Sequence, residues 1–297
     1  MKYIIFALIL LTTLFTVVFA DTVSSSIDSN LFTSSPPTQK SALATRLAEQ
    51  EAAGLNPYGI GLYQPTYILP FYYTQSPDQA VYQGQTPDNQ AVMNLELKAQ
   101  FSIAIPVLSN LFYNRNSLNI GYTQLSYWQV YANSQYFRET DYEPELFFTR
   151  QEANNFSWRL GIVHQSNGLG GEFERSWNRA YAEGIYSDEH WMVSVKPWAL
   201  IFQEESSDLH NPDITHFLGH GQLQVAYKVG DNTLSFMSRN NIESGFSRGA
   251  EELDWSFPLR GHFRGFIQFF SGYGQSLIEY NHYTSSFGIG IALNDWI

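Results

Sequence analysis

The chain has 297 residues, of which 44% are hydrophobic and 16% aromatic, while only 15% are charged and none is cysteine. This composition excludes a disordered chain, a disulfide framework and a zinc site built from thiolates. The formal net charge of -12 argues against nucleic acid as a partner, because binding phosphate groups requires a basic surface. The same figures suit both a soluble protein and a membrane barrel that hides half of its residues from lipid.

The N-terminus contains Lys2, an apolar run over residues 3–20 and a Val-x-Ala ending. This pattern predicts a cleaved signal peptide over residues 1–20, and therefore export. A single membrane-anchoring helix is the alternative, since the run is nearly long enough to cross a bilayer. No later stretch reaches the ~20 apolar residues of a membrane helix. Residues 21–55, rich in Ser, Thr, Gln and Ala, are expected to form a flexible leader.

A long alternating run follows this leader. Apolar side chains occupy every odd position from Met93 to Ile105, and Glu96 and Lys98 are among the polar residues between them. The alternation lasts longer than a usual globular strand of ~5–6 residues. It predicts a strand with one face against lipid and the other in a wet lumen.

Comparable runs recur to the end of the chain. They predict an all-β fold, a twelve-stranded antiparallel transmembrane β-barrel of the outer membrane over residues 56–297. A large soluble β-sandwich also alternates, but the signal peptide and the strand length favour the barrel. The predicted strands are residues 63–73, 92–106, 118–131, 143–151, 156–166, 174–187, 190–203, 214–229, 232–240, 249–259, 264–278 and 286–297.

Five prolines conflict with this barrel. Proline cannot donate a backbone hydrogen bond, so a closed barrel tolerates it poorly inside a strand. The sequence alone offers no way to accommodate these residues. They are Pro70, Pro106, Pro144, Pro197 and Pro258.

Polar residues fall on the lipid face of two neighbouring predicted strands. In the run 156–166 the outward parity is apolar as far as Ile162, and the next two members are His164 and Ser166. Side chains at i and i+2 share a face, with Cα atoms roughly 6.6–6.8 Å apart, so imidazole and hydroxyl can meet. Asn178 shares the outward parity of the following strand.

These three residue types suit nucleophilic catalysis. Polar groups facing lipid cost free energy and are usually functional or interfacial. A serine becomes nucleophilic when a base takes its proton, and the base works best when a third group fixes its tautomer. Ser166, His164 and Asn178 supply these roles, although a pair at headgroup depth would need no chemistry. The glycine-rich segment 167–173 is predicted to be an external loop whose N–H groups could stabilise an oxyanion.

The sequence around these residues resembles a known family. Residues 164–168, HQSNG, and 175–179, RSWNR, are similar to the signature of the outer-membrane phospholipase A family. Other stretches, such as FRET at 137–140 and SGYG at 271–274, extend the resemblance over roughly residues 56–297. It implies a calcium-dependent A1/A2 phospholipase that acts on membrane phospholipids. It also implies a homodimer when active and a monomer at rest, in the outer membrane of a Gram-negative bacterium, with the active site near the outer leaflet.

The resemblance assigns roles residue by residue. Ser166 corresponds to the nucleophile, His164 to the general base and Asn178 to the residue that orients the imidazole. The amide of Gly168 would donate to the oxyanion. Gln124 matches a glutamine at the dimer seam of the family. Its parity independently puts it on the lipid face. The alternative is a position at the aqueous rim of the barrel.

The implied calcium site is where the chain departs from the family. The main-chain carbonyl of Leu169 and a carbonyl of the partner aligned with Ser134 are the expected ligands, and a family serine hydroxyl falls on Glu174. A carboxylate is a better ligand for a hard cation than a hydroxyl, although a solvated loop charge is the alternative. A second calcium position, used by the monomer, would fall near Glu205 or Asp208.

The sequence alone leaves other interpretations open. His210, His216 and His220 look like a metal cluster, but the last two lie near the ends of the predicted strand 214–229, where lumen or rim histidines are expected. A catalytically silent porin-like or structural barrel would share the fold. A lipid acyltransferase could use the same acyl-enzyme.

Overall fold

The structure is a computed structural model in which the described residues are 61–297, apart from 112–114, 153–154, 203–209, 243 and 262. They all belong to one compact unit, Lys40–Ile297. The predicted signal peptide and leader, residues 1–55, lie outside the described residues. So do Glu205 and Asp208, the candidates for a second calcium position.

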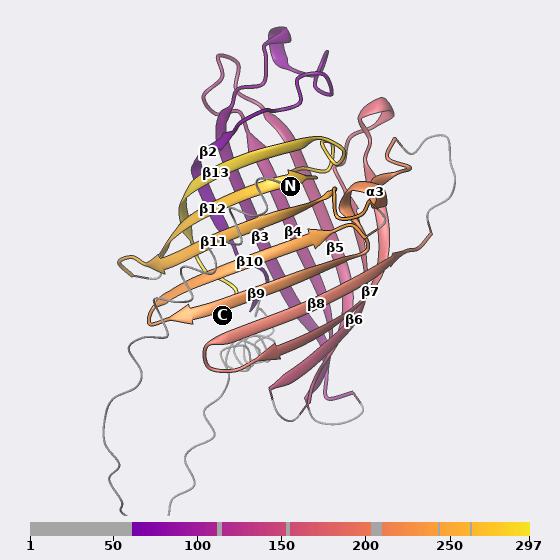
Figure 1. The fold of residues 1–297 in the computed structure, drawn as a ribbon, viewed down its shortest axis with the longest axis vertical. Coiled ribbons are helices and arrows are strands. Elements are labelled where there is room, and N and C mark those ends of the chain that lie inside the picture. Colours follow the sequence, from indigo (N-terminus) through magenta and orange to yellow (C-terminus); the bar gives the residue numbers. More distant parts are fainter. Residues whose placement is uncertain (1–60, 112–114, 153–154, 203–209, 243, 262) are drawn as a thin grey trace, which may run out of the picture. The chain divides into compact units, whose positions relative to one another are not determined.

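Twelve long antiparallel strands close into a barrel (Figure 1), which confirms the predicted fold. Each strand pairs with its neighbours along the chain, and β13 pairs with β2 to close the ring. A two-residue strand, β1 (Gly61–Leu62), also pairs with β3. The long strands are β2 (Tyr67–Thr74), β3 (Leu95–Ser109), β4 (Asn116–Trp128), β5 (Phe137–Gln151), β6 (Phe156–Ser166), β7 (Ser176–Ser187), β8 (Trp191–Leu200), β9 (Gly221–Val229), β10 (Asn232–Asn240), β11 (Gly249–Pro258), β12 (Arg264–Tyr273) and β13 (Tyr283–Ala292).

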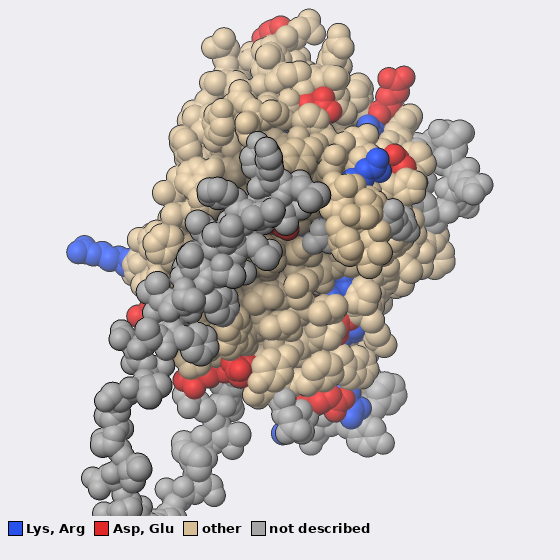
Figure 2. All heavy atoms as spheres, in the orientation of Figure 1, with Lys and Arg blue, Asp and Glu red and all other residues tan. Residues whose placement is uncertain are grey.

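The period-two pattern places side chains as the sequence predicts. On β3, Glu96 and Lys98 are 1% and 3% exposed in the lumen, whereas the outward Phe101 is 48% exposed. Apolar outward residues form the exposed belt of the barrel. Figure 2 shows one face of the molecule, on which the acidic and basic side chains are few and scattered. No helix in the described residues is long and apolar enough to cross a membrane.

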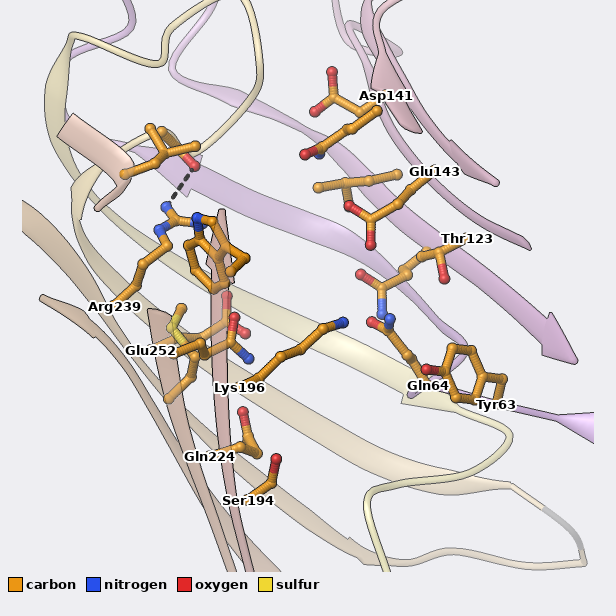
Figure 3. Close-up of a pocket in the computed structure, with 18 of the residues that line it drawn as sticks. Tyr63, Gln64, Thr123, Asp141, Glu143, Ser194, Lys196, Gln224, Arg239 and Glu252 are labelled. Carbon is orange, nitrogen blue, oxygen red and sulfur yellow. Dashed lines mark hydrogen bonds between the residues drawn. The ribbon is translucent and has the colours of Figure 1, made fainter. Parts of the chain in front are cut away.

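The lumen is polar and largely filled. It holds a cavity of about 240 Å³, into which Lys196 and Arg239 point from one wall while Asp141 and Glu143 face them from another (Figure 3). Nearer the rim that carries the β6–β7 connection, the connection 274–282 turns inward. There the Ile278 N–H donates to Glu139 Oε1 at 2.9 Å, and Leu277 N–H to Asp141 Oδ2 at 3.1 Å.

Three of the five prolines lie next to a register shift or at a strand end. Register shifts occur between Leu69 and Tyr72, next to Pro70, and between Pro106 and Leu108. Pro258 is the last residue of β11. A bulge or a strand end removes the need for the missing N–H, which is how the closed barrel tolerates these three residues. Pro144 and Pro197 lie within β5 and β8, where no such irregularity explains them.

Part of the predicted strand 214–229 is wrong. Residues Ile214–Leu218 form a short helix, α3, and β9 begins only at Gly221. His216 is therefore helical and His220 precedes the strand. The Asn241 Nδ2 group donates to Thr215 O at 2.9 Å, a tertiary contact that holds the helix and that no local pattern could predict.

Two other predicted strands run five residues past their observed ends. The run 264–278 stops being a strand at Tyr273, because Gly274 adopts a positive φ of 67° and the chain turns into the lumen. The run 286–297 stops at Ala292. Beyond it, Trp296 and Ile297 pack against a buried cluster on β7, β8 and β9 instead of continuing the sheet.

The two rims differ in their connections. The connections at the rim that carries residues 167–175 are all longer than those at the opposite rim (Figure 1). Long external loops and short periplasmic turns are typical of outer-membrane barrels. The rim with the β6–β7 connection therefore corresponds to the external side.

Candidate functional site

The three expected catalytic residues share one patch of the outer wall. In the ladder between β6 and β7, His164 pairs with Asn178, and Ser166 pairs with Ser176. His164 is exposed, while Ser166 and Asn178 are half-buried. Two strands thus hold the three side chains on the same outward face.

His164 and Asn178 are in direct contact. His164 Nδ1 lies 2.8 Å from Asn178 Oδ1. An amide oxygen can only accept, so Nδ1 donates the proton and Nε2 is left with its lone pair. The imidazole is therefore held in the tautomer that a general base requires, with Ser166 two residues along the same face.

A row of side chains connects this patch to the expected dimer seam. Gln124 on β4 pairs with Tyr142 on β5, and Tyr142 pairs with Ser166 on β6. The Tyr122 hydroxyl donates to Gln124 Oε1 at 2.9 Å, and Gln124 Nε2 donates to Ser126 Oγ at 3.1 Å. The amide of Gln124 is thus satisfied within its own strand on the outward face.

Asn167 organises the loop that follows Ser166. Its side chain is only 3% exposed, and its Oδ1 accepts from the Arg175 N–H at 3.0 Å and the Leu169 N–H at 3.3 Å. Its Nδ2 donates to Phe173 O at 2.9 Å. Sequence reasoning missed this residue, although an Asn directly before Gly is a recognisable turn signal. The Asn167 side chain therefore ties the start of the loop to its end.

Gly168 occupies a position that requires glycine. Its φ is +66°, and a Cβ atom there would lie 2.9 Å from Cε2 of Tyr142. Any larger residue would be strained and would displace either the loop or the ring. The backbone of the expected oxyanion donor is thus packed directly against the row that runs from Gln124 to Ser166.

A second buried amide braces the start of β7. Asn211 is fully buried, and its Oδ1 accepts from the Ser176 N–H at 3.1 Å while its Nδ2 donates to Ser176 O at 2.9 Å. Asn211 comes from the β8–β9 connection, distant in sequence. Nothing in the local sequence around Asn211 indicates which strand it supports.

The β6–β7 loop offers oxygen donors that fit a hard cation. Leu169 is 38% exposed, and Glu174 is half-buried at the end of the 3-10 helix η2 (Gly171–Phe173). A main-chain carbonyl and a carboxylate are the ligand types that calcium prefers. The third expected ligand, Ser134, lies in another connection, 129–136. In the described part of the chain, no group of three or more His, Cys, Asp or Glu side chains could hold a metal, so His210, His216 and His220 form no metal site.

Comparisons with known proteins identify the family of the chain. Residues 43–293 match the family model described as phospholipase A1. The chain is 35% identical to phospholipase A1 of Escherichia coli K12, over 88% of this chain and 89% of that protein. It is 34% identical to the Klebsiella pneumoniae phospholipase A1, over 88% and 90% of the two chains.

Solved structures give the same result. A calcium-bound dimer of the Salmonella typhi outer membrane phospholipase has a TM-score of 0.74 at 33% identity, covering 82% of this chain and 96% of that one. Outer membrane phospholipase A from Escherichia coli also has a TM-score of 0.74, at 32% identity, covering 80% and 99%. The barrel is therefore an outer-membrane protein, and the chain belongs to the phospholipase A1 family, a family of phospholipid-hydrolysing enzymes.

Proposed function

We propose that this protein hydrolyses acyl esters of membrane phospholipids, at the A1 and A2 positions, through an acyl-enzyme on Ser166. The observation that carries the proposal is the contact of 2.8 Å between His164 Nδ1 and Asn178 Oδ1 on the lipid-facing wall, beside Ser166. A base with a fixed tautomer and a nearby hydroxyl is the arrangement that activates serine. The family relationship supports phospholipids as the substrate class.

The mechanism follows from the roles of these side chains. His164 Nε2 takes the proton of Ser166 as Ser166 Oγ attacks the ester carbonyl, and the Gly168 N–H donates to the oxyanion that forms. His164 then returns the proton to the leaving lysophospholipid oxygen, which breaks the ester bond. Water attacks the acyl-enzyme with its proton passing to His164, and His164 protonates Ser166 as the fatty acid leaves.

Calcium and a second copy of the chain belong to the same proposal. The Leu169 carbonyl and Glu174 would hold calcium together with the Ser134 carbonyl of a partner subunit. When bound, calcium would supply positive charge beside the developing oxyanion. Gln124 would lie at the dimer seam. Because one ligand comes from the partner, the monomer would be the resting state. The calcium-bound dimer of the Salmonella typhi relative supports this arrangement.

The decisive experiment compares wild type with Ser166→Ala in phospholipid–detergent micelles, with and without calcium. We expect hydrolysis to fall by about 10³-fold or more in Ser166→Ala, with lysophospholipid and fatty acid as the wild-type products. Ser176→Ala is the matched control, since Ser176 pairs with Ser166 on the same face. Hydrolysis retained in Ser166→Ala would remove this residue from the mechanism, and an acyl group transferred to an acceptor would indicate an acyltransferase.

A further inference from the structure

Ser134 is held by a neighbouring loop through both its backbone groups and its side chain. Gln90 Nε2 donates to Ser134 O at 2.5 Å, and the Ser134 N–H donates to Gln90 Oε1 at 3.4 Å. The Ser134 hydroxyl donates to Asp88 Oδ2 at 2.6 Å. The Gln90 amide thus pairs with Ser134 as the backbone of an adjacent strand would.

The loop that supplies these contacts is itself anchored. Gln90 and Asp88 lie in the β2–β3 connection, residues 75–94. Across this connection Gln79 Nε2 donates to Val92 O at 2.8 Å, and the Val92 N–H donates to Gln79 Oε1 at 2.9 Å. Tyr82, 2% exposed, receives a hydrogen bond at its hydroxyl from Arg138 on β5. The residues that hold Ser134 therefore belong to a connection that is itself anchored to the barrel.

We propose that Gln90 is a positioning residue for the Ser134 carbonyl, a role that rests on the proposed calcium-bridged dimer. A carbonyl oxygen has two lone pairs, and Gln90 occupies one of them. The direction of the other is thereby fixed before any partner arrives. A ligand that is already ordered loses less conformational entropy when it binds. Gln90 thus lowers the calcium concentration at which two copies associate.

The test is Gln90→Met, which keeps the size of the side chain but removes both hydrogen bonds. Sedimentation equilibrium of the full chain in detergent, with calcium as the only added ligand, gives the midpoint of dimer formation. We expect this calcium midpoint to rise about five- to tenfold, as the loss of one or two hydrogen bonds predicts. Thermal stability without calcium should stay the same, and hydrolysis should show a shifted calcium midpoint rather than a lower plateau.

Two other variants isolate the cause. Gln85→Met is the matched control, because Gln85 lies in the same connection and its side chain donates to Val81 O, at 3.4 Å, and not to Ser134. It should leave the midpoint unchanged. Asp88→Asn keeps an acceptor for the Ser134 hydroxyl and removes a charge, and it should shift the midpoint less than twofold. A shift as large as that of Gln90→Met would assign the effect to charge and overturn the positioning role.

The possible failures can be told apart. If the wild type dimerises with calcium but Gln90→Met behaves like Gln85→Met, only the role of Gln90 is overturned. A lower midpoint in Gln90→Met would also overturn it, because Gln90 would then compete with calcium for the carbonyl. If the wild type shows no calcium-dependent dimer, the proposed switch fails together with this role, while hydrolysis by Ser166 is still judged by its own experiment.

Discussion

Arg138 in the lumen and His164 on the outer wall are both polar residues of long strands, but their surroundings differ. Arg138 Nε lies 2.7 Å from Glu96 Oε2 and its Nη1 lies 2.8 Å from Glu279 Oε2, with all three side chains at most 1% exposed. Among the described residues, the side-chain partner of His164 is Asn178, and His164 faces outward. In the lumen, these three side chains neutralise one another's charge and link β3, β5 and the connection 274–282. Outside, a group with a remaining lone pair is available for chemistry.

The largest expected effect on stability comes from breaking the lumen network. Arg138→Met leaves the carboxylates of Glu96 and Glu279 buried without their partner, so the free energy of unfolding should fall by about 3–5 kcal/mol. This free energy is measured by urea unfolding in lipid vesicles, in which unheated gel electrophoresis separates the folded barrel from the unfolded chain. In the half-exposed pair Arg150–Glu152, at 2.8 Å, Arg150→Met should cost under about 1 kcal/mol. Equal losses in the two variants would contradict the contrast.

On the outer wall we expect large changes in rate with small changes in stability. Gly168→Ala places a methyl group 2.9 Å from the Tyr142 ring at a φ of +66°, which displaces the proposed oxyanion donor. The kcat should fall about 10²- to 10³-fold. Gly170→Ala is the control, since a Cβ there meets nothing within 4 Å. If both variants lose the same activity, the loop as a whole and not the Gly168 amide is responsible.

Asn178→Ala should have a smaller effect on the same reaction. It removes the acceptor that fixes the His164 tautomer, and kcat should fall roughly 10- to 100-fold while the melting temperature stays the same. Asn178→Asp restores an acceptor and should recover much of the loss. A full loss in Asn178→Asp would show that the neutral amide itself is required, rather than an oxygen at that position.

The smallest expected effect is a loss of stability at low pH. Burial raises the pKa of the Glu279 carboxyl, but the charge of Arg138 and the hydrogen bonds that Glu279 accepts from the Asp78 N–H and the Ser276 hydroxyl outweigh burial and hold that pKa below its usual value. This stabilisation is present above the unfolded pKa of about 4.3 and is lost as pH falls through the lower folded value. Unfolding between pH 7 and pH 3 should show this loss in wild type. Arg138→Met should lack it, and an identical acid profile would contradict the linkage.

Most of the fold could be predicted from the period-two alternation of apolar and polar residues. The apolar positions from Met93 to Ile105 predict which side of β3 faces lipid, and the burial of Glu96 and Lys98 confirms it. Helix α3 could not be predicted, because five residues are too few for a helical period to be recognised. The inward turn at Gly274 depends on carboxylates of β5 that are far away in sequence.

The residues of the site also differ in how far the sequence predicts them. Parity puts His164, Ser166 and Asn178 on one face, because two strands with a fixed register are enough for that. The residues that shape the surrounding loops, Asn167 and Asn211, act through contacts across connections, and local sequence does not specify such partners. Gln90 belongs with them, since its partner Ser134 lies in another connection.

The amide of Asn178 has a consequence for the resting protein. An aspartate would orient the imidazole equally well, but it would fix a formal negative charge on a wall that faces hydrocarbon, where ionised groups are expensive. In the proposed function, a neutral amide keeps this lipid-facing position uncharged between reaction cycles, at little electrostatic cost. Under the proposed mechanism, charge separation at this wall is then confined to the moments of reaction.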